Sequence, residues 1–206
     1  MKVLVYGCSD NVTAIADYLE QELPIETQKL ITEKSFLEMN SAEIIEKTEN
    51  DLRGSIGENE LIVLADPLDA LVTINELKRR HPRQKFVCYG QGIERIVGKL
   101  KAIYVLTCKK IRQLEVYQRM KARCQEMEII ESDGAGWREL LKKRWIGREE
   151  IMEELKSARG APIVVFHPDL SFTRIREIVD WRGEVVDMEK ALLTVIKAEL
   201  GLKKWC

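Results

Sequence analysis

Short apolar runs, each followed by a helical pattern, recur along the chain, and this repetition restricts the fold more than any other feature. Leu61–Leu64 and Ile163–Phe166 are two such runs, one in each half of the chain, and both open into a turn and a helix. Continuous apolar strands are typical of parallel sheets buried on both faces, and strands that alternate with helices place those helices on the two faces. The sequence therefore predicts an α/β protein with parallel sheets.

The two halves of the chain share this layout, and the last strand and helix are expected to return to the first half. We expect two doubly wound parallel-sheet lobes with a central cleft: residues 1–95 with 186–206 form the first lobe, and residues 96–185 form the second. Ser41 is expected to cap the helix that follows it, because its hydroxyl can accept from the free amides of the first turn. Apolar spacing predicts one continuous helix over residues 111–124.

The charge balance argues against a nucleic-acid partner. The 206 residues carry 33 basic and 34 acidic side chains, for a formal net charge of -1, so the chain has no overall basic footprint. No apolar stretch reaches the ~18–20 residues that a membrane span needs. The first residues lack the apolar core of a signal peptide. We expect a cytoplasmic protein that binds neither nucleic acid nor membranes.

The five cysteines are scattered along the chain. They are Cys8, Cys88, Cys108, Cys124 and Cys206. No two of them form a CxxC pair, so neither a disulfide framework nor a structural zinc site is expected. No cofactor or metal is predicted. The expected partner is a small-molecule ligand, and a homodimer is left open.

The first strand carries a resemblance to the aspartate/glutamate racemase family. The strand ends in Gly7-Cys8-Ser9 and is followed by a helix. It is similar to the family's opening strand, which carries an acid and a serine at these places. Gly7 replaces the acid here, and Cys8 replaces the serine.

Two later strand ends extend the resemblance to the family's two cysteine motifs. Residues 64–66 (LAD) are similar to the first motif, with Ala65 in place of the cysteine. Residues 166–169 (FHPD) are similar to the second, with His167 in place of the cysteine and Asp169 in place of the histidine. The layout of strands and helices resembles the family over nearly the whole chain, although none of its signature motifs is intact.

The resemblance implies the family's two-lobed fold, and the altered strand ends imply a change in chemistry. The family racemises with two thiols, because inversion at the α-carbon needs groups on opposite faces that each act as acid and base. Ala65 has no titratable atom, and a single base at His167 does not readily invert a stereocentre. We expect a racemase-like protein without racemase activity, whose cleft serves a small ligand or a regulatory role.

Candidate site residues lie where strands end, since α/β sheets bind ligands at the carboxyl ends of their strands. Cys8 and His167 are the candidates for catalysis. The expected ligand-binding residues are Cys8, Ser9, Asp66, Asp69, Gln91, Thr107, Cys108, His167 and Asp169.

Structural roles compete with several of these assignments. Asp66 and Asp69 open a helix that either carboxylate could cap. Gln91 lies in a Gly-Gln-Gly segment that could bring an anion to the backbone but also suits a plain tight turn. Two other functions stay open: an enzyme of different chemistry, such as a lyase, hydrolase or isomerase acting on a small carboxylate through Cys8 or His167, and a structural or interaction protein.

Overall fold

The computed structural model divides the chain into two compact units, which are described separately. The first comprises Met1–Ile93 with Met188–Cys206, and the second comprises Glu94–Asp187. The sequence placed these boundaries at 95/96 and 185/186. The structure describes residues 1–8, 11–32, 36–93, 97, 100–124, 126–133, 153, 155–156, 158–168, 170, 175, 186 and 188–202.

The first unit is built on a four-stranded parallel sheet with the order β2-β1-β3-β4. Its strands are β1 (Lys2–Gly7), β2 (Glu26–Ile31), β3 (Leu61–Leu64) and β4 (Phe86–Cys88). The inner strands β1 and β3 are almost wholly buried, as their continuous apolar sequences predict. β2 lies at one edge, so each of its residues is exposed or partly exposed.

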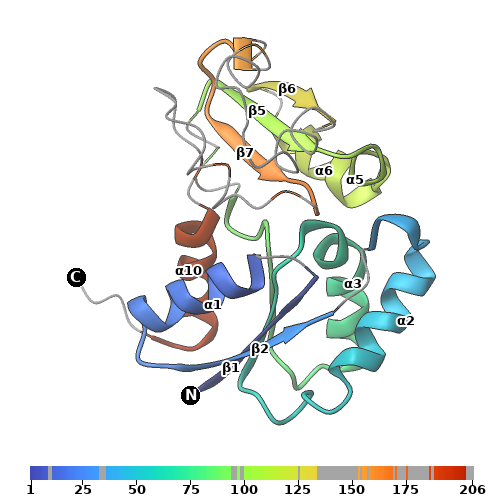
Figure 1. Cartoon of the computed structure of the whole chain (residues 1–206), viewed down its shortest axis with the longest axis vertical. Coiled ribbons are helices and arrows are strands. Elements are labelled where there is room, and N and C mark those ends of the chain that lie inside the picture. Colours follow the sequence, from blue (N-terminus) through green and yellow to red (C-terminus); the bar gives the residue numbers. More distant parts are fainter. Residues whose placement is uncertain are drawn as a thin grey trace. The chain divides into compact units, whose positions relative to one another are not determined.

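Helices cover both faces of this sheet. They are α1 (Asn11–Glu22), the short 3-10 helix η1 (Phe36–Glu38), α2 (Ser41–Leu52), α3 (Pro67–Arg80) and α10 (Met188–Glu199). α1 and α10 lie on one side of the sheet, and α2 and α3 on the other (Figure 1). α10 is the last described helix of the chain, yet it packs beside the first unit's β4.

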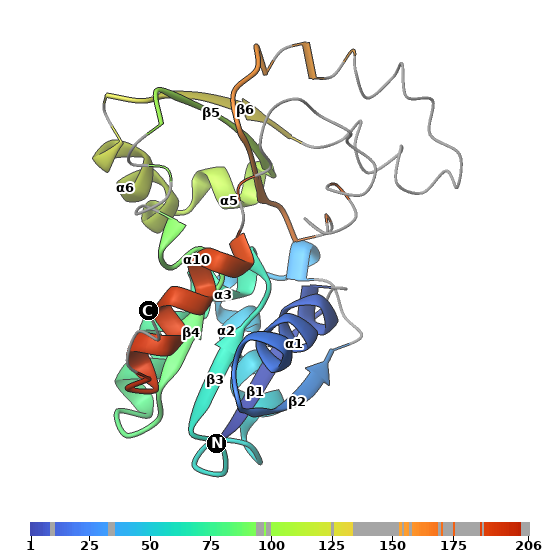
Figure 2. The ribbon, with the colours of Figure 1, turned by 90° about the vertical axis from the view of Figure 1, so that its left-hand side faces the viewer.

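The second unit holds a three-stranded parallel sheet with the order β6-β5-β7. Its strands are β5 (Ala102–Thr107), β6 (Glu128–Ser132) and β7 (Ile163–Phe166). Two short helices, α5 (Lys109–Gln113) and α6 (Glu115–Arg123), follow β5 and lie beside each other (Figure 2). The central strand β5 and the strand β7 are apolar and buried.

The predicted α/β class with parallel sheets is confirmed, whereas the central cleft stays a prediction. Among the residues that the structure describes, no helix combines the length and apolarity that a bilayer crossing requires.

The predicted continuous helix over residues 111–124 is wrong, because the chain breaks at Leu114. Leu114 is extended, with φ -70° and ψ 130°, and separates α5 from α6. Ile111 and Tyr117 are buried on either side of the break, so the apolar spacing does not reveal it. The side-chain amide of Gln118 donates to the carbonyl of Arg112 at 2.5 Å, which satisfies a backbone acceptor near the end of α5.

The predicted N-cap of α2 is wrong by one residue, because Asn40 and not Ser41 is the N-cap. Asn40 Oδ1 accepts from the amides of Ala42 at 3.0 Å and Glu43 at 3.1 Å. The Glu43 carboxylate accepts from the Asn40 amide at 2.7 Å, which completes a reciprocal capping box. Asparagine and serine are both good caps, so only the backbone conformation distinguishes them.

Asn40→Ala should lower the free energy of unfolding by about 1 kcal/mol, because two first-turn amides of α2 lose their acceptor. Ser41→Ala is the matched control, since Ser41 is exposed and lies inside the helix. We expect it to have little effect. Urea denaturation of both variants measures the difference, and equal losses would contradict Asn40 as the cap.

Candidate functional site

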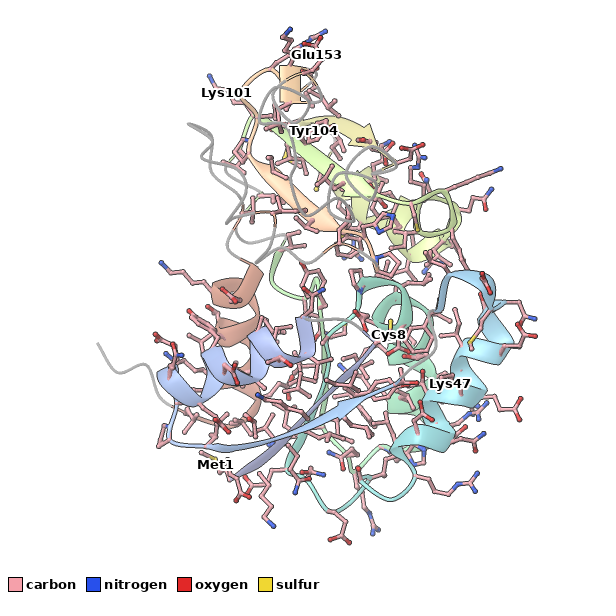
Figure 3. The ribbon with its side chains drawn as sticks, viewed as in Figure 1. Met1, Cys8, Lys47, Lys101, Tyr104 and Glu153 are labelled. Atoms are coloured by element: carbon pink, nitrogen blue, oxygen red, sulfur yellow. The ribbon has the colours of Figure 1, made fainter. Side chains whose placement is uncertain are left out.

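The carboxyl ends of β1 and β3 lie side by side and bring the predicted residues Cys8 and Asp66 together. Tyr6 pairs in register with Leu64, and the amide of Ala65 donates to the Tyr6 carbonyl at 2.8 Å. The segment that begins at Gly7 therefore runs beside the segment that begins at Ala65. Figure 3 labels Cys8 at this end of β1.

Asp66 fills the space beside Gly7. A Cβ atom added to Gly7 would overlap Asp66 Oδ2 and would lie 3.0 Å from Cγ2 of Val12. Asp66 Oδ2 accepts a hydrogen bond from the backbone amide of Cys8. Asp66 is fully buried, so this charge-assisted bond forms in a low-dielectric setting. The missing side chain at position 7 thus leaves room for a carboxylate from the neighbouring strand.

Neither aspartate caps α3 with its side chain, contrary to the capping interpretation. Asp66 occupies the N-cap position but makes no side-chain hydrogen bond to the helix. Its carboxylate instead reaches across to β1. Asp69 lies in the first turn, where it binds hydroxyl groups of Thr48 and Thr73. The local sequence could not predict these contacts. A capping interpretation considers only the segment around the helix start, whereas Cys8 and Thr48 belong to other segments.

Asp69 is a buried carboxyl group that connects α2 with α3. Its Oδ1 accepts from the Thr48 hydroxyl at 2.6 Å and lies 3.3 Å from the Thr73 hydroxyl. Its Oδ2 has no hydrogen-bond partner among the described residues. Burial raises the pKa of Asp69 to about 7; the negative charge of Asp66 adds to this effect, and the Thr48 hydrogen bond opposes it.

Tyr6, Lys47 and Asp51 form a second polar cluster close to Asp69. The Tyr6 hydroxyl donates to Asp51 Oδ2 at 2.9 Å, and Lys47 Nζ lies 2.7 Å from the same oxygen. Burial raises the pKa of Tyr6 well above its usual range, and the negative charge of Asp69 raises it further. The sequence analysis missed this cluster. The available signal was Thr48, a polar residue in the otherwise apolar inward stripe of α2.

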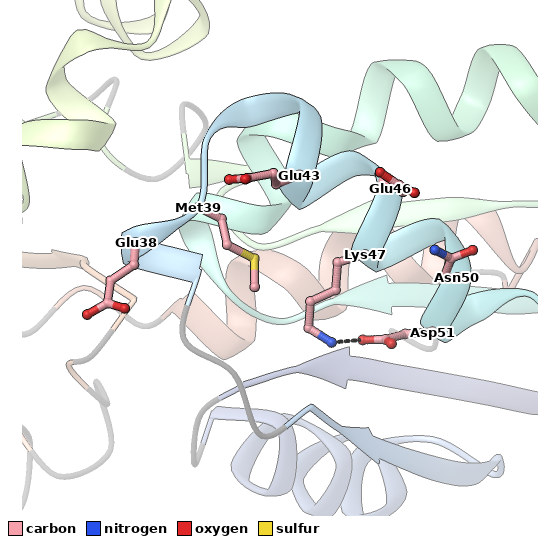
Figure 4. A pocket seen from close by; sticks show the side chains of 7 residues that line it. All are labelled: Glu38, Met39, Glu43, Glu46, Lys47, Asn50 and Asp51. Carbon is pink, nitrogen blue, oxygen red and sulfur yellow. Dashed lines mark hydrogen bonds and ion pairs between the residues drawn. The ribbon is translucent and has the colours of Figure 1, made fainter.

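An open groove of about 850 Å³ runs along α2 beside this cluster (Figure 4). It is lined by Glu38, Met39, Glu43, Glu46, Lys47, Asn50 and Asp51. Several of its charged groups already have structural partners: Glu43 completes the α2 cap, and Lys47 pairs with Asp51. The groove is therefore a polar surface of α2 rather than part of the strand-end site.

The thiols of Cys8 and Cys88 in the first unit are poor nucleophiles. Burial raises the pKa of the Cys8 thiol well above its usual range, and the adjacent Asp66 carboxylate raises it further. Burial raises the pKa of Cys88 to about 12. A thiol must ionise to act as a nucleophile, so both groups are protonated and unreactive near neutral pH.

Gln91 lies in a tight turn that follows β4. Gly90 and Gly92 have positive φ values of 94° and 86°, which suit glycine. The Gln91 side-chain oxygen accepts from the amide of Cys88 at 3.1 Å. A Cβ atom at Gly92 would lie 2.9 Å from the carbonyl oxygen of Ala191, so the turn packs closely against α10. This geometry favours the turn interpretation over an anion-binding loop.

Three predicted residues of the second unit, Thr107, Cys108 and His167, lie at the ends of β5 and β7. Thr107 pairs in register with Phe166, so His167 follows directly beside it. Thr107 and His167 are fully buried, and Cys108 is 8% exposed. The Thr107 hydroxyl has no hydrogen-bond partner among the described residues. A buried hydroxyl without a partner is unfavourable, so a polar group that reached Thr107 would stabilise this strand end.

Two predicted residues, Ser9 and Asp169, lie outside the residues that the structure describes. Within the described ranges, no three side chains of histidine, cysteine, aspartate or glutamate are arranged to hold a metal ion.

Solved structures share this fold. Escherichia coli glutamate racemase, in complex with L-glutamate and the activator UDP-MurNAc-Ala, matches with a TM-score of 0.78 and 16% identity, over 98% of this chain and 82% of that one. An aspartate racemase homologue from Pyrococcus horikoshii matches with a TM-score of 0.63 and 12% identity, over 97% of this chain and 99% of that one. These matches confirm the predicted racemase fold.

A decarboxylase shares the fold as well. A point mutant of arylmalonate decarboxylase, in a form associated with a sulfate ion, matches with a TM-score of 0.56 and 10% identity, over 98% of this chain and 94% of that one. No protein-family model matches the chain, and no curated protein matches it either. At identities this low, the similarity establishes the fold but not the activity.

Gly7→Ala should lower the free energy of unfolding by roughly 1–3 kcal/mol, because the new methyl group displaces the Asp66 carboxylate from the Cys8 amide. Asp66→Gly in the same chain frees that space. The double variant should therefore lose less stability than the sum of the two single variants. Urea denaturation of the four chains measures this coupling.

Gly54→Ala is the matched control for this cycle, since no atom lies within 4 Å of a Cβ at Gly54. We expect Gly54→Ala to leave stability nearly unchanged. Additive losses in the Gly7 and Asp66 variants would contradict the close packing of the two strand ends.

Asp69→Asn should change how stability depends on pH. The folded-state pKa of Asp69 is raised from 3.8 to about 7, so between these values the folded protein holds a proton that the unfolded chain has lost. The free energy of unfolding therefore falls as pH rises through this window and is level above it. Asp69→Asn removes this decline. At pH 8 we expect its free energy of unfolding to exceed that of the unaltered chain by roughly 2–4 kcal/mol.

Urea denaturation at pH 4 and pH 8 measures this dependence. Asp17→Asn is the control, since Asp17 is 51% exposed and pairs with Lys29 on the surface. Exposed ion pairs contribute little, so Asp17→Asn should keep the pH dependence of the unaltered chain. If Asp69→Asn showed the same pH dependence of stability as the unaltered chain, Asp69 would be ionised in the folded protein.

Proposed function

We propose that this chain is a glutamate/aspartate racemase-like protein without racemase activity, which keeps a small-ligand site at the carboxyl ends of its strands. The observation that carries the proposal is the end of β3. Ala65 is fully buried and offers only a methyl group where the two-thiol reaction needs an acid–base group. One face of an α-carbon is then left without a proton donor or acceptor at this position.

The surroundings of Ala65 support the loss of racemisation. Cys8 is the nearby thiol that could replace the missing one, but burial and the Asp66 carboxylate keep it protonated. Asp66 already accepts the Cys8 amide, so the protein's own carboxylate takes a donor that an anionic substrate could use. The buried Asp66 and Asp69 side chains also disfavour a second negative charge at this edge.

The end of β5 supports a retained ligand site. The buried Thr107 hydroxyl lacks a partner within the described part of the chain and lies beside the segment that contains His167. A hydroxyl group can both donate and accept, and the carboxyl end of a parallel strand is the usual place for a ligand. A small polar ligand would satisfy this group.

The second candidate is a one-acid reaction at His167, such as decarboxylation of a small dicarboxylate. This reaction needs a proton delivered to one face only, which a single histidine can supply. The observation that favours it is the shared fold of arylmalonate decarboxylase. His167 follows β7 as Ala65 follows β3, so the two strand ends differ in the chemistry they can offer.

The full chain, incubated with L-glutamate or L-aspartate in D2O, should incorporate no deuterium at Cα above a blank without protein. Proton NMR measures this exchange, with Escherichia coli glutamate racemase as the positive control. A thermal-shift screen of amino acids and dicarboxylates should find a stabilising ligand. Thr107→Val should lose that shift while keeping its own stability, because valine preserves the shape and removes the unpartnered hydroxyl.

Matched variants separate the two candidates. Phenylmalonate is added to the same samples, and release of CO2 is followed. The chain has two histidines, so His81→Ala is the control for His167→Ala. Exchange at Cα in the unaltered chain would overturn the proposed loss of racemisation. Release of CO2 that His167→Ala abolishes and His81→Ala retains would establish the second candidate, and no ligand shift at all would overturn the proposed ligand site.

A further inference from the structure

A groove of about 660 Å³ lies at the amino ends of β3 and β4, the edge of the sheet opposite Cys8 and Asp66. This volume falls within the range of small-molecule sites. We propose that the groove binds a small hydroxylated organic acid. None of the residues predicted from strand ends lies on it, so the inference is independent of the proposed function.

The floor of the groove is fixed before any ligand binds. Gln84 is 9% exposed, and its side-chain oxygen accepts from the Gly57 amide at 2.8 Å. Its side-chain amide donates to the Asn59 carbonyl at 3.0 Å. These bonds tie the loop before β3 to the segment before β4. A preformed site avoids the entropic penalty of ordering a loop on binding.

Asn59 is one of the lining residues of the groove, and its side-chain oxygen is a buried acceptor that no described residue uses. Asn59 is 7% exposed, and its Nδ2 donates to the Ser55 carbonyl at 3.2 Å. This bond fixes the orientation of the amide, because only nitrogen can donate to a carbonyl. Asn59 Oδ1 has no partner among the described residues. A ligand that carries a hydroxyl group would satisfy this buried oxygen.

The charges on the groove favour an anion. Arg83 is exposed, and no ion pair joins it to another described residue. Lys85 Nζ donates to the carbonyl of Glu199 at 2.6 Å, at the end of α10, and keeps further N–H groups available. The carboxylate of Glu60 is 53% exposed and lies 3.9 Å from the amino group of Met1, which offsets its charge.

The apolar residues that line the groove favour a ligand with an apolar body. Ile56 and Leu200 contribute apolar surface beside the charged groups. Arginine binds carboxylates with two parallel hydrogen bonds, so a carboxylate on such a skeleton suits Arg83. A ligand with a carboxylate for Arg83, an apolar body and a hydroxyl for Asn59 Oδ1 matches all three features.

The experiment uses the full ¹⁵N-labelled chain and 4-hydroxybenzoate as the probe. Amide shifts should change at residues 56–60 and 81–85, and the affinity should be in the millimolar range. Benzoate lacks the donor and methyl 4-hydroxybenzoate lacks the charge, so both should bind more weakly. Arg83→Gln should weaken binding of 4-hydroxybenzoate by about tenfold, because it removes a charge-assisted contact.

Arg119→Gln is the matched control, since Arg119 is an exposed arginine of α6 in the second unit. It should leave the affinity unchanged. Shifts that map elsewhere, or none at all, would overturn the site. Equal losses in Arg83→Gln and Arg119→Gln would show nonspecific charge attraction and would also overturn it. Equal affinities for benzoate and 4-hydroxybenzoate would overturn the assignment of Asn59 as the acceptor of the hydroxyl group.

Discussion

The hydrogen bond between the Asp66 carboxylate and the Cys8 amide joins the ends of β1 and β3, and the candidate site depends on it. The bond requires a glycine at position 7, because any side chain there would occupy the place of the carboxylate. It also commits a negative charge to a buried position. Burial raises the pKa of the Cys8 thiol and the pKa of Asp69, and the Asp66 charge raises both further, so this contact adds to the protonation of its neighbours.

Further buried polar groups connect this part of the sheet with α2 and α3, the two helices on one of its faces. The Asp69 carboxyl links α3 to α2 through Thr48, and the Tyr6 hydroxyl links β1 to α2 through Asp51. Buried polar groups are tolerated when their partners are in place, and they then fix the relative positions of the elements that carry them. The same desolvation that positions these groups also favours the neutral form of Asp69.

The sequence predicted the elements better than their boundaries and side-chain partners. Continuous apolar runs located β1, β3, β5 and β7, because strands buried on both faces leave a clear signal. The cap of α2 fell on Asn40 instead of Ser41, and Leu114 divides a segment whose apolar spacing looks continuous. Asp66 and Asp69 suited capping by residue type, but their partners come from β1 and α2, which lie far away in the sequence.

The sequence by itself determined the parallel α/β fold and the absence of a thiol at Ala65, because residue identity and apolar periodicity are local properties of the chain. Only the tertiary structure decided what surrounds that position. Strand pairing placed Asp66 against Gly7, and helix packing enclosed Asp69. The groove at the amino ends of β3 and β4 likewise exists because three distant segments meet there. Burial and long-range pairing set these environments, and neither is a property of a single segment.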